Sequence, residues 1–167
     1  MRRIIYTILI LLIISFSYGQ KVFEYEFDKN ISLKVLENTE EGEMPNGKFI
    51  KGTFENEFFL CLSSNKLKDK FDVKDEEDLI KLFHGIRDGG LKTTEGKLVN
   101  EEIINIKNKK VLNFKISFEL EGLNKLIESY VFVHNNIIYT VQFMNNEKEF
   151  EKLESFRKDI LDSVKFN

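Results

Sequence analysis

Apolar and polar residues alternate along most of the chain, a pattern typical of half-buried β-strands. It predicts strands over residues 22–27, 31–36, 48–54, 58–63, 97–106, 110–120, 126–134 and 137–144. The clearest run places Leu112, Phe114, Ile116, Phe118 and Leu120 on one face. We therefore expect Phe118 to be a core residue.

Turn-forming residues separate these runs. Residues 39–47 (TEEGEMPNG) contain the only proline and two glycines, and we expect a loop there. Hairpins are expected around Glu55-Asn56, Asn108-Lys109, Glu121-Gly122 and Asn135-Asn136. A two-residue turn at the last of these pairs Phe132 with Tyr139 and Tyr130 with Val141. Because Val131, Val133 and Ile138 lie on the opposite face of this hairpin, both of its faces should be covered.

Two segments show helical spacing instead. Leu79, Leu82, Phe83 and Ile86 predict a helix over about 73–88, capped by Asp72 or Asp75 and ended by Gly89-Gly90. A second helix is expected over 147–164, with Asn146 and Glu149 as a capping box and a Glu154–Lys158 pair. Its apolar stripe consists of Phe150, Leu153, Phe156, Ile160 and Val164.

The N-terminus has the three parts of a secretory signal peptide. Two arginines precede an apolar run over residues 4–14, and the small residues Ser17 and Gly19 stand three and one before the expected cut. An uncleaved membrane anchor is the alternative, but eleven residues span only about 16 Å of a roughly 30 Å hydrocarbon layer. We expect cleavage after Gly19, and no lipid anchor because Gln20 rather than cysteine follows. Residues 20–167 then form a single domain.

Charge argues against several partners. Removing residues 1–19 takes away two arginines and no acid, which changes the net charge from −3 to −5. The basic residues are scattered among acids, so no patch follows a phosphate backbone and nucleic acid is not an expected partner. No second apolar run approaches membrane-spanning length, so stable membrane insertion of the mature chain is not expected.

Two short motifs resemble catalytic or phosphate-binding sequences, but their contexts do not fit. Gly85-Ile-Arg-Asp-Gly-Gly-Leu-Lys92 places Leu91 before the lysine and leaves a helix rather than opening one. Ser63-Ser-Asn-Lys66 and Ser155-Phe-Arg-Lys158 both match S-x-x-K, without the other motifs of that enzyme class. We expect neither a phosphate loop nor serine catalysis.

Histidine, cysteine and acidic residues give no clear site. His84 and His134 are far apart in sequence, and with one cysteine they provide no zinc-ligand spacing. Cys61 lies in an apolar strand and is expected to be a buried, unpaired thiol. The run from Asp72 to Asp78 lacks the glycine of a calcium loop, and its acids suit a helix N-terminus. We therefore expect no catalytic residue, cofactor or metal.

The order of elements resembles the PsbP-like α/β/α sandwich family. The stretches that carry this resemblance are ISLKVLEN, EEDLIKLFHGIRDGGLKTTEGKLVNEEIINIKNKKVLNFKISFEL, YVFVHNNIIYTVQF and FEKLESFRKDILDSVKF. It implies an α+β fold, with an antiparallel sheet of about six to eight strands and helices on its faces. It also implies an accessory or binding role, and it transfers no site residue.

Two functions follow as hypotheses. The first is an exported, non-catalytic binding or accessory protein, periplasmic or extracellular and monomeric, whose partner is a protein or small molecule. The second is a small secreted hydrolase or transferase whose site is assembled from distant residues. A histidine–carboxylate contact inside a cleft would favour the enzyme.

Overall fold

A computed structural model describes residues 22–54, 58–67, 73 and 75–167. The expected signal peptide, Asp72 and the Glu55-Asn56 turn lie outside the described residues. Among those residues, no helix is both long enough and apolar enough to cross a membrane.

The described chain forms two antiparallel sheets. The seven-stranded sheet has the order β3-β4-β5-β9-β8-β7-β6, and a smaller sheet has the order β1-β2-β10. The strands of the large sheet are β3 (Thr39–Met44), β4 (Gly47–Phe54), β5 (Phe58–Lys66), β6 (Lys97–Ile106), β7 (Lys109–Leu120), β8 (Leu123–His134) and β9 (Ile137–Asn146). Those of the small sheet are β1 (Val22–Asp28), β2 (Ile31–Leu36) and β10 (Lys165–Phe166).

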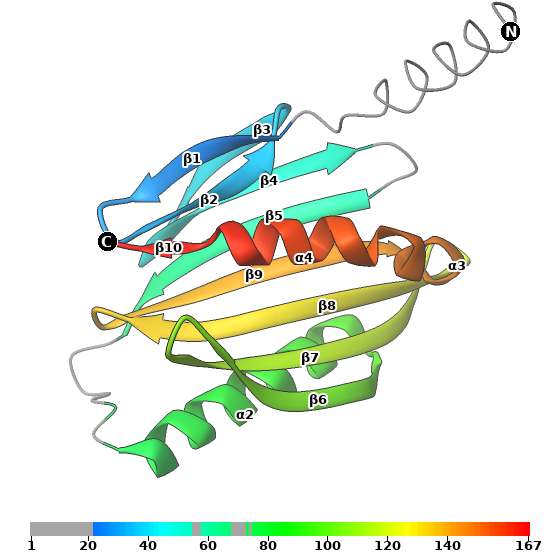
Figure 1. Cartoon of the computed structure of the whole chain (residues 1–167). Helices are drawn as coiled ribbons and strands as arrows, with labels where there is room; N and C mark the ends of the chain where they lie inside the picture. Colours follow the sequence, from blue (N-terminus) through cyan, green and yellow to red (C-terminus); the bar gives the residue numbers. More distant parts are fainter. Residues whose placement is uncertain (1–21, 55–57, 68–72, 74) are drawn as a thin grey trace, which may run out of the picture.

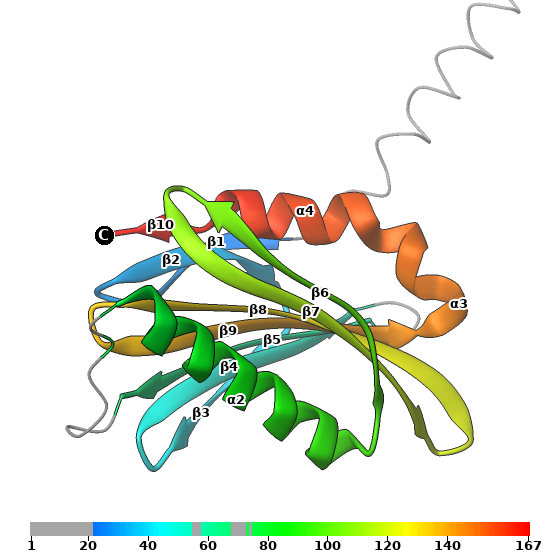
Figure 2. The ribbon, with the colours of Figure 1, turned by 90° about the horizontal axis from the view of Figure 1, so that it is seen from below.

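Helices cover both faces of the large sheet, which confirms the predicted α+β sandwich. Helix α2 (Glu76–Thr94) lies on one face, while α4 (Glu154–Ser163) and the small sheet lie on the other (Figures 1 and 2). Phe83 of α2 packs on Leu112, Phe114, Ile116 and Val131. The other core joins α4 and β2 to the opposite face, and it includes Phe27, Leu33, Phe132, Tyr139, Phe143 and Ile160.

The β8–β9 hairpin has the predicted register. Tyr130 stands opposite Val141 and Phe132 opposite Tyr139, whose rings stack at 5.5 Å. Asn135 and Asn136 both adopt positive φ, as a tight turn between twisted strands requires. The turn between β6 and β7 is one residue earlier than predicted, because Lys107 and Asn108, not Asn108 and Lys109, have positive φ.

The loop predicted over residues 39–47 is wrong, since most of it is strand β3. This strand pairs with β4 from Thr39–Gly52 to Met44–Gly47, so its turn is confined to Pro45-Asn46. Gly42 made the segment look like a loop in the sequence. In the structure it lies under the Phe49 ring, and a Cβ at this position would be only 2.4 Å from Cζ of Phe49. Cross-strand packing therefore overrides the composition of this segment.

Helix α2 passes through the two glycines that were expected to end it. Asp75, one of the two predicted caps, caps the start of the helix: its side chain accepts a hydrogen bond from the backbone N–H of Asp78. The helix instead ends at Glu95, whose φ of 50° is left-handed. Each glycine costs a helix interior only about 1 kcal/mol, and Leu91 beyond them packs against the α2 core.

The C-terminal helix is interrupted. It consists of α3 (Glu147–Phe150), a 3-10 turn over Glu151–Leu153, and α4. The predicted capping box is absent, because Asn146 makes no side-chain cap hydrogen bond. Lys158 pairs with Asp162 at 2.5 Å instead of with Glu154. The apolar stripe is correct, with Phe150, Phe156, Ile160 and Val164 buried and Leu153 partly buried.

Phe118 was wrongly predicted to be a core residue. Leu112, Phe114 and Ile116 are buried under α2, but Phe118 is only half-buried and Leu120 is 43% exposed. The end of the β7–β8 hairpin projects past the end of α2 (Figure 2), so the helix does not cover it. Alternation along β7 identified the apolar face of the strand correctly. It could not show where along the strand helix α2 stops covering that face.

Candidate functional site

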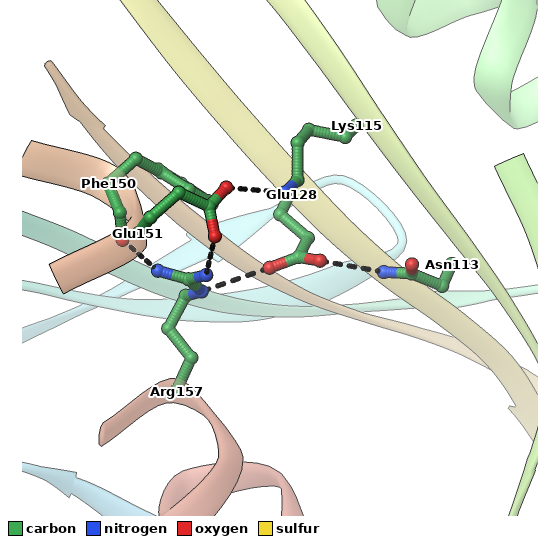
Figure 3. Close-up of polar contacts among 6 residues, drawn as sticks. All are labelled: Asn113, Lys115, Glu128, Phe150, Glu151 and Arg157. Atoms are coloured by element: carbon green, nitrogen blue, oxygen red, sulfur yellow. Dashed lines mark hydrogen bonds and ion pairs between the residues drawn. The ribbon is translucent and has the colours of Figure 1, made fainter. Parts of the chain in front are cut away.

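Charged residues meet beneath the C-terminal helix, between α4 and strands β7 and β8 (Figure 3). Arg157 is 3% exposed, and its Nε lies 3.0 Å from Oε2 of Glu128. The other carboxylate oxygen of Glu128 accepts a hydrogen bond of 3.4 Å from Asn113. Glu151 links Arg157 to Lys115: its Oε2 lies 3.9 Å from Nη2 of Arg157, and its Oε1 lies 3.0 Å from Nζ of Lys115. We call these five residues the Arg157 cluster.

Phe150 completes the anchoring of this cluster. Its carbonyl oxygen accepts a hydrogen bond from Nη1 of Arg157, and its ring centroid lies 3.9 Å from Cζ of the same guanidinium. Lys115 Nζ also approaches this ring, at 5.0 Å. Burial, followed by the negative charge of Glu128, raises the pKa of the neighbouring Tyr130 phenol.

The sequence pattern did not predict the Arg157 cluster. β-Sheet pairing of Lys115 with Glu128 and of Asn113 with Tyr130 places these polar residues on the face that receives α4. One signal was available: Arg157 lies seven residues after Phe150, on the same helix face as the apolar stripe. Since both ions of the pair are buried and hydrogen-bonded to each other, the arrangement holds the helix on the sheet.

A second polar cluster joins the two sheets. Tyr139 is fully buried, donates a hydrogen bond of 2.8 Å to Asp28 and accepts one of 3.1 Å from Asn30. Asn135 donates to Asn30 at 2.8 Å, and Asp28 also accepts from the backbone of Asn30 and Ile31. We call these residues the Tyr139 cluster. Burial, more than the carboxylate, raises the pKa of Tyr139, so the phenol is a proton donor that holds β9 to the β1–β2 turn.

A histidine–carboxylate contact lies where α2 crosses β6. His84 Nε2 is 3.3 Å from Oε1 of Glu101, and Arg87 Nη1 is 2.5 Å from Oε2. The His84 side chain is 46% exposed. Hydrogen bonds to Asp88 and Glu101 raise the pKa of Arg87, so the guanidinium keeps its charge beside Glu101. The arrangement fastens α2 to β6.

Neither S-x-x-K motif has a serine–lysine hydrogen bond among the residues that the structure describes. Ser63 and Lys66 lie three positions apart in β5, so their side chains leave opposite faces of the strand. In α4, Lys158 is paired with Asp162. The glycine-rich segment from Gly85 to Lys92 is wholly helical, so its backbone N–H groups are used by the helix itself.

The contacts of the two remaining candidate residues, His134 and Cys61, are structural. His134 packs edge-on against Phe166 of β10 at 5.2 Å. Cys61 is free but only partly buried, so the prediction of full burial was too strong; burial nevertheless raises its pKa to about 11. In the described ranges, no group of three or more His, Cys, Asp or Glu side chains could hold a metal ion.

Exposed apolar side chains gather at one corner of the large sheet. The described chain has six exposed large hydrophobic residues, and five of them belong to β6 and the adjoining end of the β7–β8 hairpin. Four of them lie at the same end of the sheet, and we call these four the β6 corner: Leu98, Val99, Leu120 and Leu123, which are 42–54% exposed. Ile103 stands opposite Leu112, further along β6. Scattered apolar residues are ordinary on a surface, whereas a concentration suggests contact with a partner.

Comparison with known proteins identifies the fold. No family model matches the sequence, and no curated protein matches it. The structure resembles the cyanobacterial PsbP (CyanoP) of Synechocystis, with a TM-score of 0.64, 11% identity, and coverage of 90% of this chain and 96% of that one. It also resembles LpqN of Mycobacterium tuberculosis, described as involved in cell envelope biogenesis, with a TM-score of 0.58, 11% identity, and coverage of 88% and 91%.

A third structure agrees with these two. PA94 of Pseudomonas aeruginosa, a protein of unknown function, has a TM-score of 0.53 and 10% identity, with coverage of 85% of this chain and 94% of that one. The chain therefore has the PsbP-like fold, as its sequence pattern indicated. At these identities the likeness concerns the fold and assigns no site residue.

Proposed function

We propose that the protein is an exported accessory protein that acts by binding a partner and not by catalysis. In this proposal residues 1–19 are removed on export, and residues 20–167 work as one monomeric domain in the periplasm or outside the cell. The description of LpqN as involved in cell envelope biogenesis and the PsbP-like fold support this reading. Neither nucleic acid nor a membrane-inserted state is part of it.

The observation that carries the proposal is the way in which the polar groups are used. Arg157 and Glu128 are buried against each other, and Tyr139 is enclosed by Asp28 and Asn30. A catalytic group needs room for a substrate beside it. These clusters instead join α4 and the small sheet to the large sheet. Most of the exposed large hydrophobic residues of the described chain lie at the β6 corner.

The test is affinity isolation of the tagged protein from the exported fraction of its own cells, with intact-mass analysis. We expect a chain that begins at Gln20 and one or more partners that co-purify in fixed proportion. A full-length chain retained in the cytoplasm, or an exported protein that releases product from a substrate with no bound partner, would contradict the proposal.

A secreted hydrolase or transferase is the second candidate, and the His84–Glu101 contact is the observation in its favour. The carboxylate could orient the imidazole, as in an acid–base pair. However, within the part of the chain that the structure describes, no serine, threonine or cysteine side chain is hydrogen-bonded to His84. If an activity is found, His84→Gln should abolish it; unchanged activity in that variant would exclude this site.

A further inference from the structure

The turn between β3 and β4 contains the one Asn–Gly pair of the sequence, Asn46-Gly47. Asparagine before glycine is chemically labile, because the glycine nitrogen can attack the side-chain carboxamide and glycine has no side chain to hinder the approach. Asn46 is exposed, so water reaches its side chain. Among the described residues no hydrogen bond holds this carboxamide, and only the backbone carbonyl of Asn46 is bonded. The side chain is therefore free to turn towards Gly47.

The backbone at this pair can open. Met44 and Gly47 form the last pair of the β3–β4 hairpin. β3 is an edge strand, and within the large sheet it pairs with β4 alone. Terminal pairs of this kind open at little cost in free energy. Each opening frees the Gly47 nitrogen for attack on Asn46.

Other exposed asparagines in turns lack this combination. Asn108 is followed by Lys109, and the Asn135-Asn136 turn is followed by Ile137. The larger side chains of the following residues shield the backbone nitrogen that would attack. The carboxamide of Asn135 is also held, by a hydrogen bond of 2.8 Å. Exposure in a turn therefore does not single out Asn46, whereas the glycine after it does.

The chain has a related pair in a protected place. Asp88-Gly89 is the one Asp–Gly pair of the sequence, and such a pair forms the same cyclic imide when its chain is free. It lies inside α2, where the helix itself uses the backbone N–H groups and fixes the backbone. Local structure thus leaves Asn46-Gly47 reactive and keeps Asp88-Gly89 unreactive.

We propose that Asn46 is a site of spontaneous deamidation. The Gly47 nitrogen forms a bond to Cγ of Asn46, the bond from Cγ to the amide nitrogen breaks, and ammonia leaves with the proton that Gly47 loses. Water then opens the resulting succinimide. Opening at Cγ gives aspartate with an ordinary backbone, whereas opening at the main-chain carbonyl gives isoaspartate, whose backbone runs through the side chain. This inference does not depend on the proposed function.

Isoaspartate lengthens the main chain by one carbon where the turn packs tightly on β5. The carbonyl oxygen of Asn46 accepts a hydrogen bond of 2.8 Å from the backbone N–H of Lys66. Gly47 lies so close to β5 that a Cβ would be 1.9 Å from the carbonyl oxygen of Ser64. The new carboxylate also adds negative charge beside the glutamates of β3. The modified turn should therefore loosen β3 at the edge of the sheet.

The first test is to age the purified protein at neutral and at mildly alkaline pH and to map its peptides by mass spectrometry. Conversion at Asn46 should be at least about tenfold faster than at Asn108 or Asn135, because only Asn46 precedes glycine. It should be faster at the higher pH, since the Gly47 nitrogen attacks after losing its proton. An isoaspartate methyltransferase should label the aged Asn46 peptide and not the Asp88 peptide. Equal rates at these asparagines, a rate independent of pH, or equal labelling of the two peptides would overturn the inference.

Two variants separate the longer main chain from the new charge. Asn46→Gln requires a larger ring and should not deamidate, while Asn46→Asp carries the charge on an ordinary backbone. In amide hydrogen exchange, aged wild-type protein should lose protection across Thr39–Met44 and at Lys66. Aged Asn46→Gln and fresh Asn46→Asp should match fresh wild-type protein. Loss of protection in aged Asn46→Gln, or full protection in wild-type protein that carries isoaspartate, would contradict the inference.

Discussion

At the scale of single residues, burial decides how much a polar contact contributes. Tyr139 and Tyr25 both donate a hydrogen bond to a carboxylate, in Asp28 and Glu41 respectively. Tyr139 is fully buried, while the contact of Tyr25 is exposed. A buried partner left without a hydrogen bond loses solvation that it cannot regain, whereas an exposed one is rehydrated.

Tyr139→Phe should therefore lower the free energy of unfolding by about 1–3 kcal/mol, because Asp28 and Asn30 lose a buried partner. The matched control, Tyr25→Phe, should cost less than about 1 kcal/mol. Urea denaturation of both variants measures the difference. Equal losses would mean that the Tyr139 cluster does not join the two sheets as described.

The Arg157–Glu128 pair should show strong coupling. Arg157→Met leaves the Glu128 carboxylate buried without its main partner, and it should cost about 3–5 kcal/mol. The double variant Arg157→Met/Glu128→Leu should recover much of this loss, because no unpaired charge remains. A double-mutant cycle from denaturation curves gives the coupling. Additive losses would show that the two side chains act independently.

Cys61 should react slowly with alkylating reagents at pH 8, because burial raises its pKa to about 11 and the thiolate is the reactive form. The rate should rise as the pH approaches 11. The same shift favours the folded state below the thiol's ordinary pKa, and that contribution is lost as the pH rises through about 11. Lys51→Glu should slow the reaction further, since Lys51 lowers this pKa. Alkylation at pH 8 as fast as in the denatured chain would contradict the burial.

At the scale of elements, Gly89 within α2 and Gly96 just after the end of α2 are not equivalent. A Cβ at Gly89 would meet nothing within 4 Å, whereas one at Gly96 would lie 2.4 Å from Cγ2 of Ile116 and 2.8 Å from the carbonyl oxygen of Ser117. Gly89 therefore only lowers the stability of the helix, while Gly96 allows the chain to pass close to β7.

Gly89→Ala should raise the free energy of unfolding by about 0.5–1 kcal/mol, through lower chain entropy in the unfolded state and better helix propensity. Gly96→Ala should lower it, because backbone would have to move. Thermal denaturation of the two variants checks both signs. A destabilised Gly89→Ala protein would indicate that the helix ends at the glycines after all.

Most elements could be predicted from the sequence because their signals are local. Period-two alternation located the strands, and the Asn135-Asn136 turn fixed the register of Phe132 against Tyr139. The β3 strand, the extension of α2 and the exposure of Leu120 depend on contacts between distant segments, which one sequence does not reveal. The same holds for Arg157 and Glu128, which are 29 residues apart.

At the scale of the whole molecule, the two helix-covered faces and the two edges have separate roles. The Arg157 and Tyr139 clusters fasten α4 and the small sheet to one face, and α2 covers part of the other. This leaves β3 and β6 as the two edges of the large sheet. We therefore expect this to be an exported protein that holds a partner on its exposed surface, with the β6 corner as the first place to look.

Site-specific photo-crosslinking in the producing cells tests this claim most directly. A crosslinking amino acid replaces Glu102 of β6 in one strain and Glu41 of β3 in another, and the exported fraction is analysed by mass spectrometry. We expect a defined crosslinked partner at position 102, none at position 41, and a chain without residues 1–19 in both strains. Crosslinks at 41 and not at 102, no partner at either position, or a chain retained inside the cell would contradict it.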